Sequence, residues 1–387
     1  MQNSKKTFLT VLITFFSTLL IISISVFVLS LKYDIPFEKL KKVVGIIQSS
    51  YVGEYNGEEC EENAINAVLE TIGDKYAVYY NEENARKAMQ MIEGYYIGIG
   101  VEVFANTQKG YIEVISAYED SPADKAGIKS GDLIKAIDGR EYTASQMADA
   151  VSYMKGIDVD EALKTSMAIT ILRGDKETTL NLNREKIDMY KVSSKVIDNI
   201  CYIRYSGFTA ASQKVFKDII ESLGGSIRGV VVDVRNNPGG EFTSAIEMCD
   251  LFLDDEMIMY TVDKKGGKTP YIGKKGSSKL PLAILVNSQT ASAAEIFAGS
   301  MQANNRAIII GEKTYGKGVS QTVQYLNPLD KSEGALKLTT CKNYTSDGRW
   351  INESILPDIE VKTERIEDDI TYDAAFITAV NSLKEDK

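Results

Sequence analysis

The chain has 387 residues, is 44% hydrophobic and carries 54 acidic against 44 basic residues, a formal charge of -10. This composition predicts a folded protein of more than one domain, and an acidic surface of this kind argues against nucleic acid as a partner. The chain contains no histidine, which excludes self-contained Ser-His-Asp and Cys-His hydrolases and histidine-dependent metalloproteases.

The four cysteines, Cys60, Cys201, Cys249 and Cys341, lie far apart along the chain. None forms a C-x-x-C pair, and no histidine is present to complete a zinc site. We therefore expect neither a metal site nor a cofactor. Spacing does not decide whether two of them pair, and we expect four reduced, buried thiols.

The N-terminus has the pattern of a membrane anchor. Residues 7–31 carry no charge, and as a helix they exceed the roughly 30 Å apolar thickness of a bilayer. Lys5 and Lys6 precede this run and favour a cytoplasmic N-terminus. We expect residues 1–32 to be a cytoplasmic stub and single transmembrane helix in the cell membrane, with the rest of the chain extracytoplasmic. The alternative is a cleaved signal peptide, but the run is longer than usual and lacks a small-x-small cleavage site.

Residues 33–93 are predicted to form a small helical module. Phe37, Leu40, Val44 and Ile47 recur at helical spacing, and a second such run ends before Gly73. Its few apolar positions need a surface to pack on. That surface is either the next domain or a second copy of the module, which would make a homodimer.

Residues 94–185 change to the alternation of short strands, with Gly174-Asp175 as a hairpin turn. Two stretches resemble a PDZ domain: the loop Ile97-Gly98-Ile99-Gly100 and the run from Ser121 to Gly139, S-P-A-x-x-A-G-I-K-x-G-D-x-I followed by I-D-G. The resemblance implies that the loop binds the free C-terminus of a protein or peptide substrate, whose last residues add as a strand. The alternative is that the two glycines only shape a tight turn.

Residues 186–387 are predicted to form an α/β core with a C-terminal helix. Continuous apolar runs at 230–234, 282–286 and 307–310 are typical of buried strands, and residues 211–223 have the pattern of an amphipathic helix. Strands that alternate with helices favour a sheet with right-handed crossovers.

Without histidine, a serine nucleophile needs a lysine that burial keeps neutral. Lys317 lies between two glycines just after a buried strand, whereas Lys313 lies between Glu312 and Thr314 and is expected to be solvated. Ser292 falls at the start of a helix of small residues, where backbone N–H groups could stabilise an oxyanion. The alternative is that Ser292-x-x-Glu295 is only a capping box.

A third segment, Asn236-Asn237-Pro238-Gly239-Gly240, follows a buried strand and alone would be an ordinary polar turn. The three segments together resemble the C-terminal processing peptidases, whose pattern reads D-x-R-x-N-P-G-G, then V-N-x-x-[ST]-A-S-A-x-E-I, then G-x-x-x-x-G-K-G-x-x-Q. This resemblance extends from about residue 37 to residue 362. It implies a serine endopeptidase with a fold of four parts: the anchor, the helical module, the PDZ-like β-rich domain and an α/β protease core.

The resemblance also implies the roles of individual residues. Ser292 matches the nucleophile, Lys317 the general base and Gln321 the residue that orients the lysine amine. The backbone donors of the oxyanion hole match Ala293 with either Gly239 or Gly240. The chain departs from the family's pattern at residues 348–353, Gly-Arg-Trp-Ile-Asn-Glu, which we expect to touch only the edge of the core.

Two other motifs do not support a different chemistry. The segment Gly311 to Lys317 fits a phosphate-binding loop, but Gly318 replaces the Ser or Thr that would bind magnesium. Ser152 and Lys155 fit S-x-x-K of β-lactamases without the other motifs of that class, so we expect a helix surface. The rival function is a catalytically inactive, membrane-tethered PDZ scaffold, which the intact Ser292, Lys317 and Gln321 argue against.

Overall fold

The computed structural model describes residues 37–118, 120–155, 165–274, 278–362 and 369–385. The chain divides into two compact units, residues 1–67 and 68–387. Within the described ranges no helix is both long and apolar enough to cross a bilayer. The predicted anchor at residues 1–32 lies outside these ranges, so it stays a prediction.

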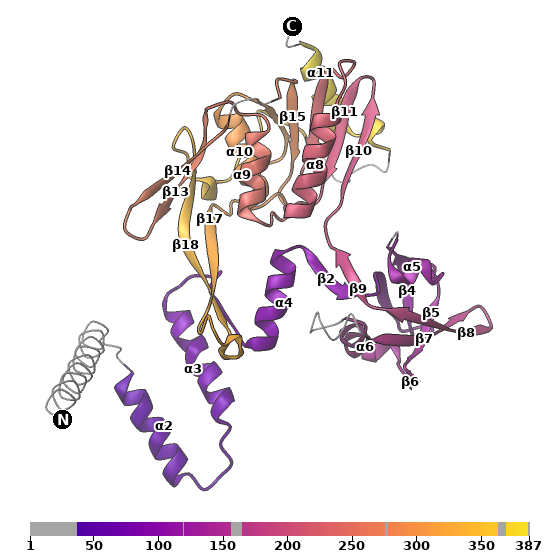
Figure 1. Ribbon diagram of the computed structural model, residues 1–387, viewed down its shortest axis with the longest axis vertical. Coiled ribbons are helices and arrows are strands. Elements are labelled where there is room, and N and C mark those ends of the chain that lie inside the picture. Colours follow the sequence, from indigo (N-terminus) through magenta and orange to yellow (C-terminus); the bar gives the residue numbers. More distant parts are fainter. Residues whose placement is uncertain (1–36, 119, 156–164, 275–277, 363–368, 386–387) are drawn as a thin grey trace, which may run out of the picture. The chain divides into compact units, whose positions relative to one another are not determined.

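Helices α2 (Glu38–Ser50) and α3 (Gly57–Thr71) form where helical periodicity predicts them (Figure 1). None of the residues described in these two helices is buried. Large apolar side chains are exposed on α2, among them Leu40, Val43 and Ile46 at 41%, 51% and 64%. An amphipathic helix of this kind normally covers its apolar face with a partner.

The end of the predicted helical module is not wholly helical. Residues Val78–Tyr80 form strand β1, which precedes helix α4 (Glu82–Ile92) and pairs antiparallel with β18 (Ala335–Thr345). The carboxylate of Asp74 also accepts a hydrogen bond from Thr339 N at 3.1 Å. The prediction of an all-helical module was therefore wrong here, because the strand depends on a partner more than 250 residues away in sequence.

Strand β1 belongs to a sheet in the order β1-β18-β13-β14, with β17 also on β18. The other strands of that sheet are β13 (Met257–Asp263), β14 (Lys268–Ile272) and β17 (Val319–Tyr325).

The PDZ-like domain is a sheet in the order β3-β4-β5-β7-β8, with β6 beside β5. Its elements are β3 (Val101–Asn106), β4 (Tyr111–Ala117), α5 (Pro122–Lys125), β5 (Leu133–Ile137), β6 (Arg140–Glu141), α6 (Met147–Met154), β7 (Ser166–Arg173) and β8 (Lys176–Asn183). Alternate residues such as Ile112, Val114 and Ile169 form its core. The predicted hairpin turn is confirmed, since Arg173 pairs with Lys176 around Gly174-Asp175. Strands β2 (Tyr95–Gly98) and β9 (Glu185–Asp188) pair with each other where the chain enters and leaves this domain.

The α/β core is a sheet in the order β10-β11-β12-β15-β16-β19. Its strands are β10 (Val192–Ile197), β11 (Ile200–Tyr205), β12 (Gly229–Asp233), β15 (Leu282–Val286), β16 (Ile308–Gly311) and β19 (Ile359–Glu360). From β11 to β19 every pairing is parallel. Every residue of β12 and β15 is buried, which confirms that continuous apolar runs indicate central strands.

Helices cover both faces of this sheet (Figure 1). One face packs against α8 (Ala210–Ser222), α9 (Phe242–Asp250) and α10 (Ala293–Ala303), and the other against α11 (Ala374–Glu385). Because the parallel strands all point one way, the loops after β12, β15 and β16 lie at one edge of the sheet. In open α/β sheets this carboxyl edge is where sites form.

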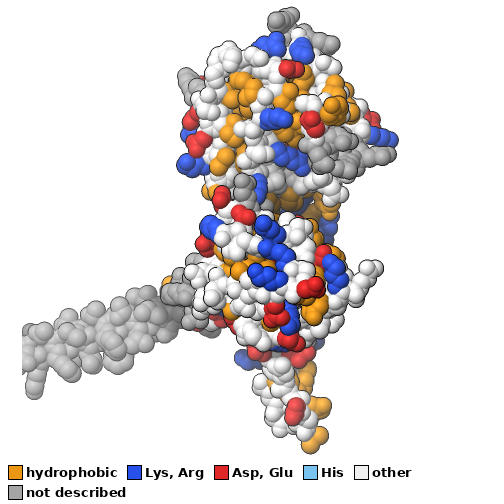
Figure 2. Space-filling model, turned by 90° about the vertical axis from the view of Figure 1, so that its right-hand side faces the viewer, with side chains coloured by type: hydrophobic (Ala, Val, Ile, Leu, Met, Phe, Trp, Pro, Cys, Tyr) orange, Lys and Arg blue, Asp and Glu red, His pale blue; other side chains and the backbone are white. Residues whose placement is uncertain are grey.

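The burial of the cysteines and the distribution of surface charge differ in part from what the sequence predicts. All four cysteines are free, but only Cys201 and Cys249 are buried, whereas Cys60 and Cys341 are half-buried. The expectation of four buried thiols was therefore wrong for two of them. On the face drawn in Figure 2, acidic and basic side chains lie intermixed with apolar ones, so the negative net charge does not form a single field there.

Candidate active site

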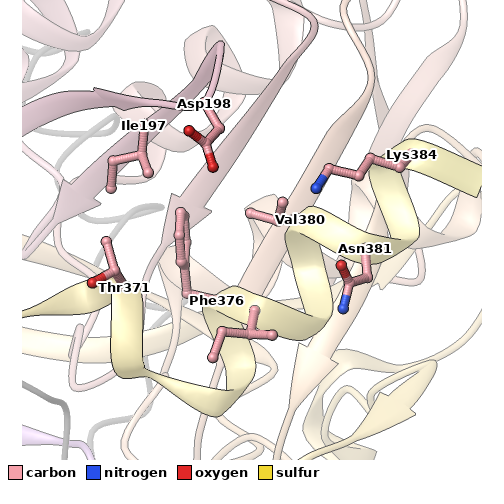
Figure 3. Close-up of a pocket in the computed structure, with 8 residues that line it drawn as sticks. Ile197, Asp198, Thr371, Phe376, Val380, Asn381 and Lys384 are labelled. Carbon is pink, nitrogen blue, oxygen red and sulfur yellow. The ribbon is translucent and has the colours of Figure 1, made fainter.

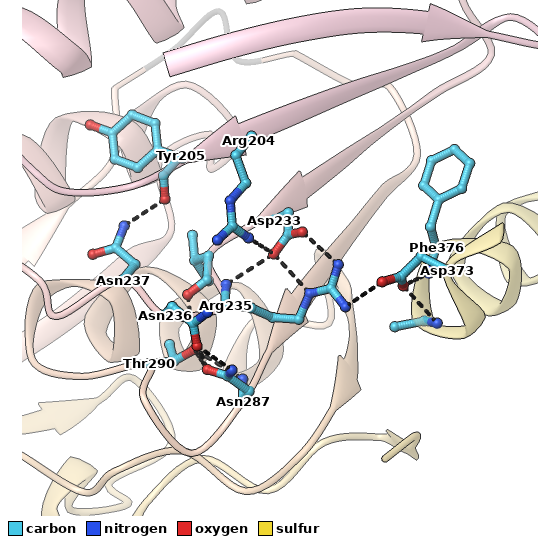
Figure 4. A network of polar contacts seen from close by, with 12 residues as sticks. Arg204, Tyr205, Asp233, Arg235, Asn236, Asn237, Asn287, Thr290, Asp373 and Phe376 are labelled. Atoms are coloured by element: carbon cyan, nitrogen blue, oxygen red, sulfur yellow. Dashed lines mark hydrogen bonds and ion pairs between the residues drawn. The ribbon is translucent and has the colours of Figure 1, made fainter. Parts of the chain in front are cut away.

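The turns that follow β12, β15 and β16 carry the three motif segments, and hydrogen bonds join them to one another. Figure 4 shows the contacts between the first two turns. The side chains of Asn236 and Asn287 bond at 2.7 Å, and Asn236 N donates to Asn287 Oδ1 at 2.9 Å. Thr290 Oγ1 donates to Val234 O at 2.9 Å, and Tyr315 N donates to Thr290 O at 3.0 Å. The three segments, which lie far apart in the sequence, therefore come together at one place in the fold.

Ser292 lies on the turn between the buried strand β15 and helix α10. Its backbone has φ 56° and ψ -118°, a conformation that non-glycine residues rarely adopt and that costs of order 1–3 kcal/mol. A strained turn between a strand and a helix is how hydrolases with a nucleophile elbow expose the reacting serine. The main chain of Ser292 closes the first turn of α10, because its carbonyl accepts from Glu295 N at 2.9 Å.

Glu295 connects the serine segment to the lysine segment. Its carboxylate is fully buried and accepts four hydrogen bonds: from Ser292 N at 2.8 Å, Thr314 Oγ1 at 2.6 Å, Gly316 N at 2.6 Å and Lys317 N at 2.8 Å. The bonds from Ser292 N and Lys317 N end on the same oxygen, Oε2. The predicted capping glutamate thus also fixes the position of the predicted base relative to the predicted nucleophile.

The amine of Lys317 lies in an environment that favours its neutral form. Burial lowers the pKa of this amine below its usual value of 10.5, and the nearby charges of Lys337 and Lys75 lower it further, while Glu295 acts in the opposite direction. The Nζ atom lies 5.0 Å from the centroid of the Tyr76 ring. Lys313, the rival base, is exposed.

The side chains predicted to act together do not bond to one another in this structure. Among the hydrogen bonds of the described residues, none joins Lys317 Nζ to Ser292 Oγ or to Gln321. The Gln321 amide instead donates to Val319 O at 3.4 Å, close to the start of β17. The orienting role of Gln321 therefore stays a prediction.

The glycine turn lies against the serine. A Cβ atom added to Gly239, whose φ is 100°, would lie 2.8 Å from both Ala293 N and the Cβ atom of Ser292. Only glycine fits at such a close approach. Ala293 is the first residue of α10, where backbone N–H groups have no partner within the helix.

The Asp-x-Arg pair before this turn anchors it in the core (Figure 4). Arg235 is 1% exposed and bonds Asp233 at 2.7 Å and Asp373 at 2.9 Å. Burial opposes the charge of Arg235, but these two carboxylates outweigh it and raise its pKa. Asp373 in turn accepts from the backbone of Ala375 and Phe376 at the start of α11. The network joins the end of β12 to the C-terminal helix.

The segment that departs from the family's pattern contacts the lysine loop, so the expectation that it touches only the edge of the core was wrong. Trp350 Nε1 donates to Gly318 O at 3.0 Å, and Gly318 N donates to Asn352 Oδ1 at 3.3 Å. A Cβ atom added to Gly318 would lie 1.9 Å from Asn352 N. The departure falls on residues that hold the backbone directly after Lys317.

In the PDZ-like loop, the side chains of Ile97 and Ile99 are buried, at 0% and 2% exposed. Gly98 ends β2, where it pairs with Glu185, and Gly100 has φ 76°. The carbonyls of Ile99 and Gly100 accept bonds from Ala123 N and Tyr118 N. No hydrogen bond of the described residues uses the N–H groups of Ile99 or Gly100, which are the donors that a terminal carboxylate would need.

A cavity of about 220 Å³ lies between helix α11 and the turn that joins β10 to β11 (Figure 3). Its lining includes Asp198, in the turn between β10 and β11, and Phe376, Val380 and Lys384 of α11. None of its lining residues belongs to the motif segments.

Sequence reasoning missed Glu295 as a link, Asn237 as more than a turn residue, and Tyr76. A signal for Glu295 was present: it is the one charged residue of helix α10, and every other residue of the run Ala293-Ala294-Glu295-Ile296-Phe297-Ala298 is apolar. A lone carboxylate in a buried helix must find several hydrogen-bond donors. No local signal marks Tyr76, because its contact with Lys317 depends on distant pairing.

The chain is similar to known peptidases over most of its length. The model of peptidase family S41 matches residues 199–361, and a PDZ domain model matches residues 113–164. The carboxy-terminal processing protease CtpA of Bacillus subtilis (strain 168) is 31% identical over 335 residues, which cover 85% of this chain and 70% of that protein. A probable CtpA-like serine protease of Staphylococcus aureus (strain MRSA252) is 28% identical over 333 residues, and the match covers 84% of this chain but 65% of that relative's length.

The solved structure of a photosystem II D1 C-terminal processing protease has a similar fold, with a TM-score of 0.51, 24% identity and coverage of 85% of this chain and 88% of that one. The two family models and the Bacillus subtilis relative place the chain in the class of C-terminal processing peptidases with a PDZ domain. The chain belongs to peptidase family S41.

Proposed function

We propose that this protein is a membrane-anchored serine endopeptidase in which Ser292 is the nucleophile and Lys317 the general base. The observation that carries the proposal is the shared carboxylate oxygen of Glu295, which binds both Ser292 N and Lys317 N at 2.8 Å. This contact fixes a serine on a strained turn beside a lysine whose pKa is lowered. The combination suits a hydrolase that lacks histidine.

In the proposed reaction, Ser292 Oγ attacks the carbonyl carbon of the peptide bond and its proton passes to the neutral amine of Lys317. Backbone N–H groups at Ala293 and the glycine turn stabilise the oxyanion. Lys317 then donates the proton to the leaving amine, and water hydrolyses the acyl-enzyme. For this proton transfer, Lys317 Nζ must move from its place near the Tyr76 ring to within hydrogen-bond distance of Ser292 Oγ. Gln321 would orient the amine in that position.

The dependence of the rate on pH tests this base. An ammonium group cannot accept the serine proton, so hydrolysis of an unfolded protein should rise with pH through the lowered pKa of Lys317 and should persist in a metal chelator. Replacing Lys337 with Met removes one charge that lowers this pKa, so the rise should move to higher pH. Lys342→Met, on the same strand, should leave it in place. A rate that falls between about pH 6 and 8, or that is lost in chelator, contradicts the mechanism.

We further propose that substrates are selected by their C-terminal tails. The N–H groups of Ile99 and Gly100 would bind the terminal carboxylate, and the last residues would add beside β3. Amidating the C-terminus of a substrate peptide, or adding a charged residue there, should weaken its binding to the Ser292→Ala protein by about tenfold or more. A titration in which free-acid and amidated peptides bind equally would refute tail recognition and leave the serine chemistry untouched.

The remaining parts of the proposal concern location and assembly. Residues 1–32 would anchor the chain in the cell membrane as a single-pass segment, with the catalytic domain extracytoplasmic. The exposed apolar side chains of α2 support a homodimer through the helical module, since pairing would remove them from water.

A further inference from the structure

Asn237 is fully buried in the glycine turn, and its groups make four hydrogen bonds, one of them from its own N–H to Val234 O at 3.2 Å. Its side-chain amide donates to Tyr205 O at 2.8 Å (Figure 4), and its Oδ1 accepts from Gly239 N at 2.8 Å. Its main-chain carbonyl accepts from Ala291 N at 3.0 Å, one residue before Ser292. Asn237 therefore joins the end of β11 and the glycine turn to the serine turn.

The bond from Gly239 N decides which glycine can bind an oxyanion. Since the N–H group of Gly239 is already used by Asn237, it is not available to a substrate. The N–H groups of Gly240 and Ala293 take part in none of the hydrogen bonds of the described residues. Of the two glycines, Gly240 is thus the one with a free donor.

The order of the strands indicates where the Gly240 N–H points. The carbonyl of Gly239 accepts from Phe208 N at 2.8 Å, so it points toward the segment after β11. In a trans peptide the next N–H points the opposite way. Strand β12 lies between β11 and β15, so the Gly240 N–H points to the side of β15, where Ser292 and Ala293 lie.

We propose that Asn237 is a positioning residue that holds Gly239 N and the peptide that follows it. The N–H groups of Gly240 and Ala293 are then the donors that bind the oxyanion. The inference rests on the proposed function, because it presumes acyl transfer at Ser292. It goes beyond that function in choosing between the two glycines and in naming the side chain responsible.

The test compares Asn237→Ala with Asn304→Ala in the full-length protein in detergent. Asn304 also donates its amide to main-chain carbonyls, of Met257 and Ser300, but lies at the far end of α10 from Ser292. Loss of Asn237 should lower kcat by about 10²-fold, the usual cost of one oxyanion donor, with little change in KM. A peptide boronic acid, which forms a tetrahedral adduct with the serine, should bind more weakly by the same factor, and the pH profile should not move.

Asn237→Ser is the conservative variant, because a serine hydroxyl can accept from the N–H two residues on, though more weakly. Its kcat should fall between those of the wild type and Asn237→Ala, and it replaces Asn237→Ala as the test if that variant does not fold. A kcat within about twofold of Asn304→Ala, or an unchanged affinity for the boronic acid, overturns the inference. If Ser292→Ala remains active, the proposed function itself fails, whereas an inactive Ser292→Ala beside an active Asn237→Ala refutes only this inference.

Discussion

Replacing Lys317 with Met should reduce peptide hydrolysis by at least about 10⁴-fold, because base and nucleophile act as one unit in forming the acyl-enzyme. Methionine keeps the apolar stem of the side chain and removes only the amine. The backbone bond from residue 317 to Glu295 can still form, so the protein should fold with a melting temperature near that of the wild type. Steady-state hydrolysis of an unfolded protein, measured with thermal melts, checks both expectations.

Lys313→Met is the matched control, since Lys313 lies in the same loop but is exposed. Its activity should stay near that of the wild type. Near wild-type turnover by Lys317→Met would show that the base is wrongly assigned, and Lys313 would then be the next candidate.

Replacing Glu295 with Gln should have the second largest effect. The carboxylate accepts four hydrogen bonds in a fully buried position, and an amide offers one oxygen and turns two donors toward N–H groups. We expect the free energy of unfolding to fall by about 1–3 kcal/mol. Activity should fall by more than about 10³-fold, because the lysine loop loses its position relative to Ser292.

Asp358→Asn tests whether such a loss is specific to Glu295. Asp358 also accepts a main-chain bond, from Ile309 N at 2.7 Å, and one from Gln302 Nε2 at 2.7 Å. Its replacement should reduce stability without a matching loss of kcat. If both variants lost activity only in proportion to stability, Glu295 would be a structural residue and not a link between the two active-site segments.

The core strands could be predicted from the sequence because burial on both faces leaves a continuous apolar run, as in Leu282–Val286. Strand β1 could not, because Val78–Tyr80 pairs with a strand more than 250 residues away. The sequence predicts Lys317 as the base from its place between two glycines after a buried strand, whereas Ser292 is predicted as the nucleophile only through the family resemblance, because its local sequence equally allows a helix cap. The contacts of Asn237 and Glu295 with distant segments escaped prediction, since roles as turn and cap residues explain both equally well in the sequence alone.

The departure at residues 348–353 shows the same limit. The unusual residues of this segment were evident in the sequence, but its position in the fold beside the lysine loop was not. Trp350 and Asn352 bond the two sides of Gly318, so this segment acts on the lysine loop only through tertiary contacts. A motif comparison identifies which residues differ, and the structure shows what they contact.

Covalent trapping at Ser292 is the most direct test of the proposed chemistry. The full-length protein would be incubated at alkaline pH with an active-site-directed fluorophosphonate, digested, and analysed by mass spectrometry to locate the modified residue. We expect a single adduct on Ser292 that forms slowly in Lys317→Met and is absent in Ser292→Ala. An adduct on another residue, or no adduct in a folded protein that cleaves peptides, would contradict the assignment of Ser292 as the nucleophile.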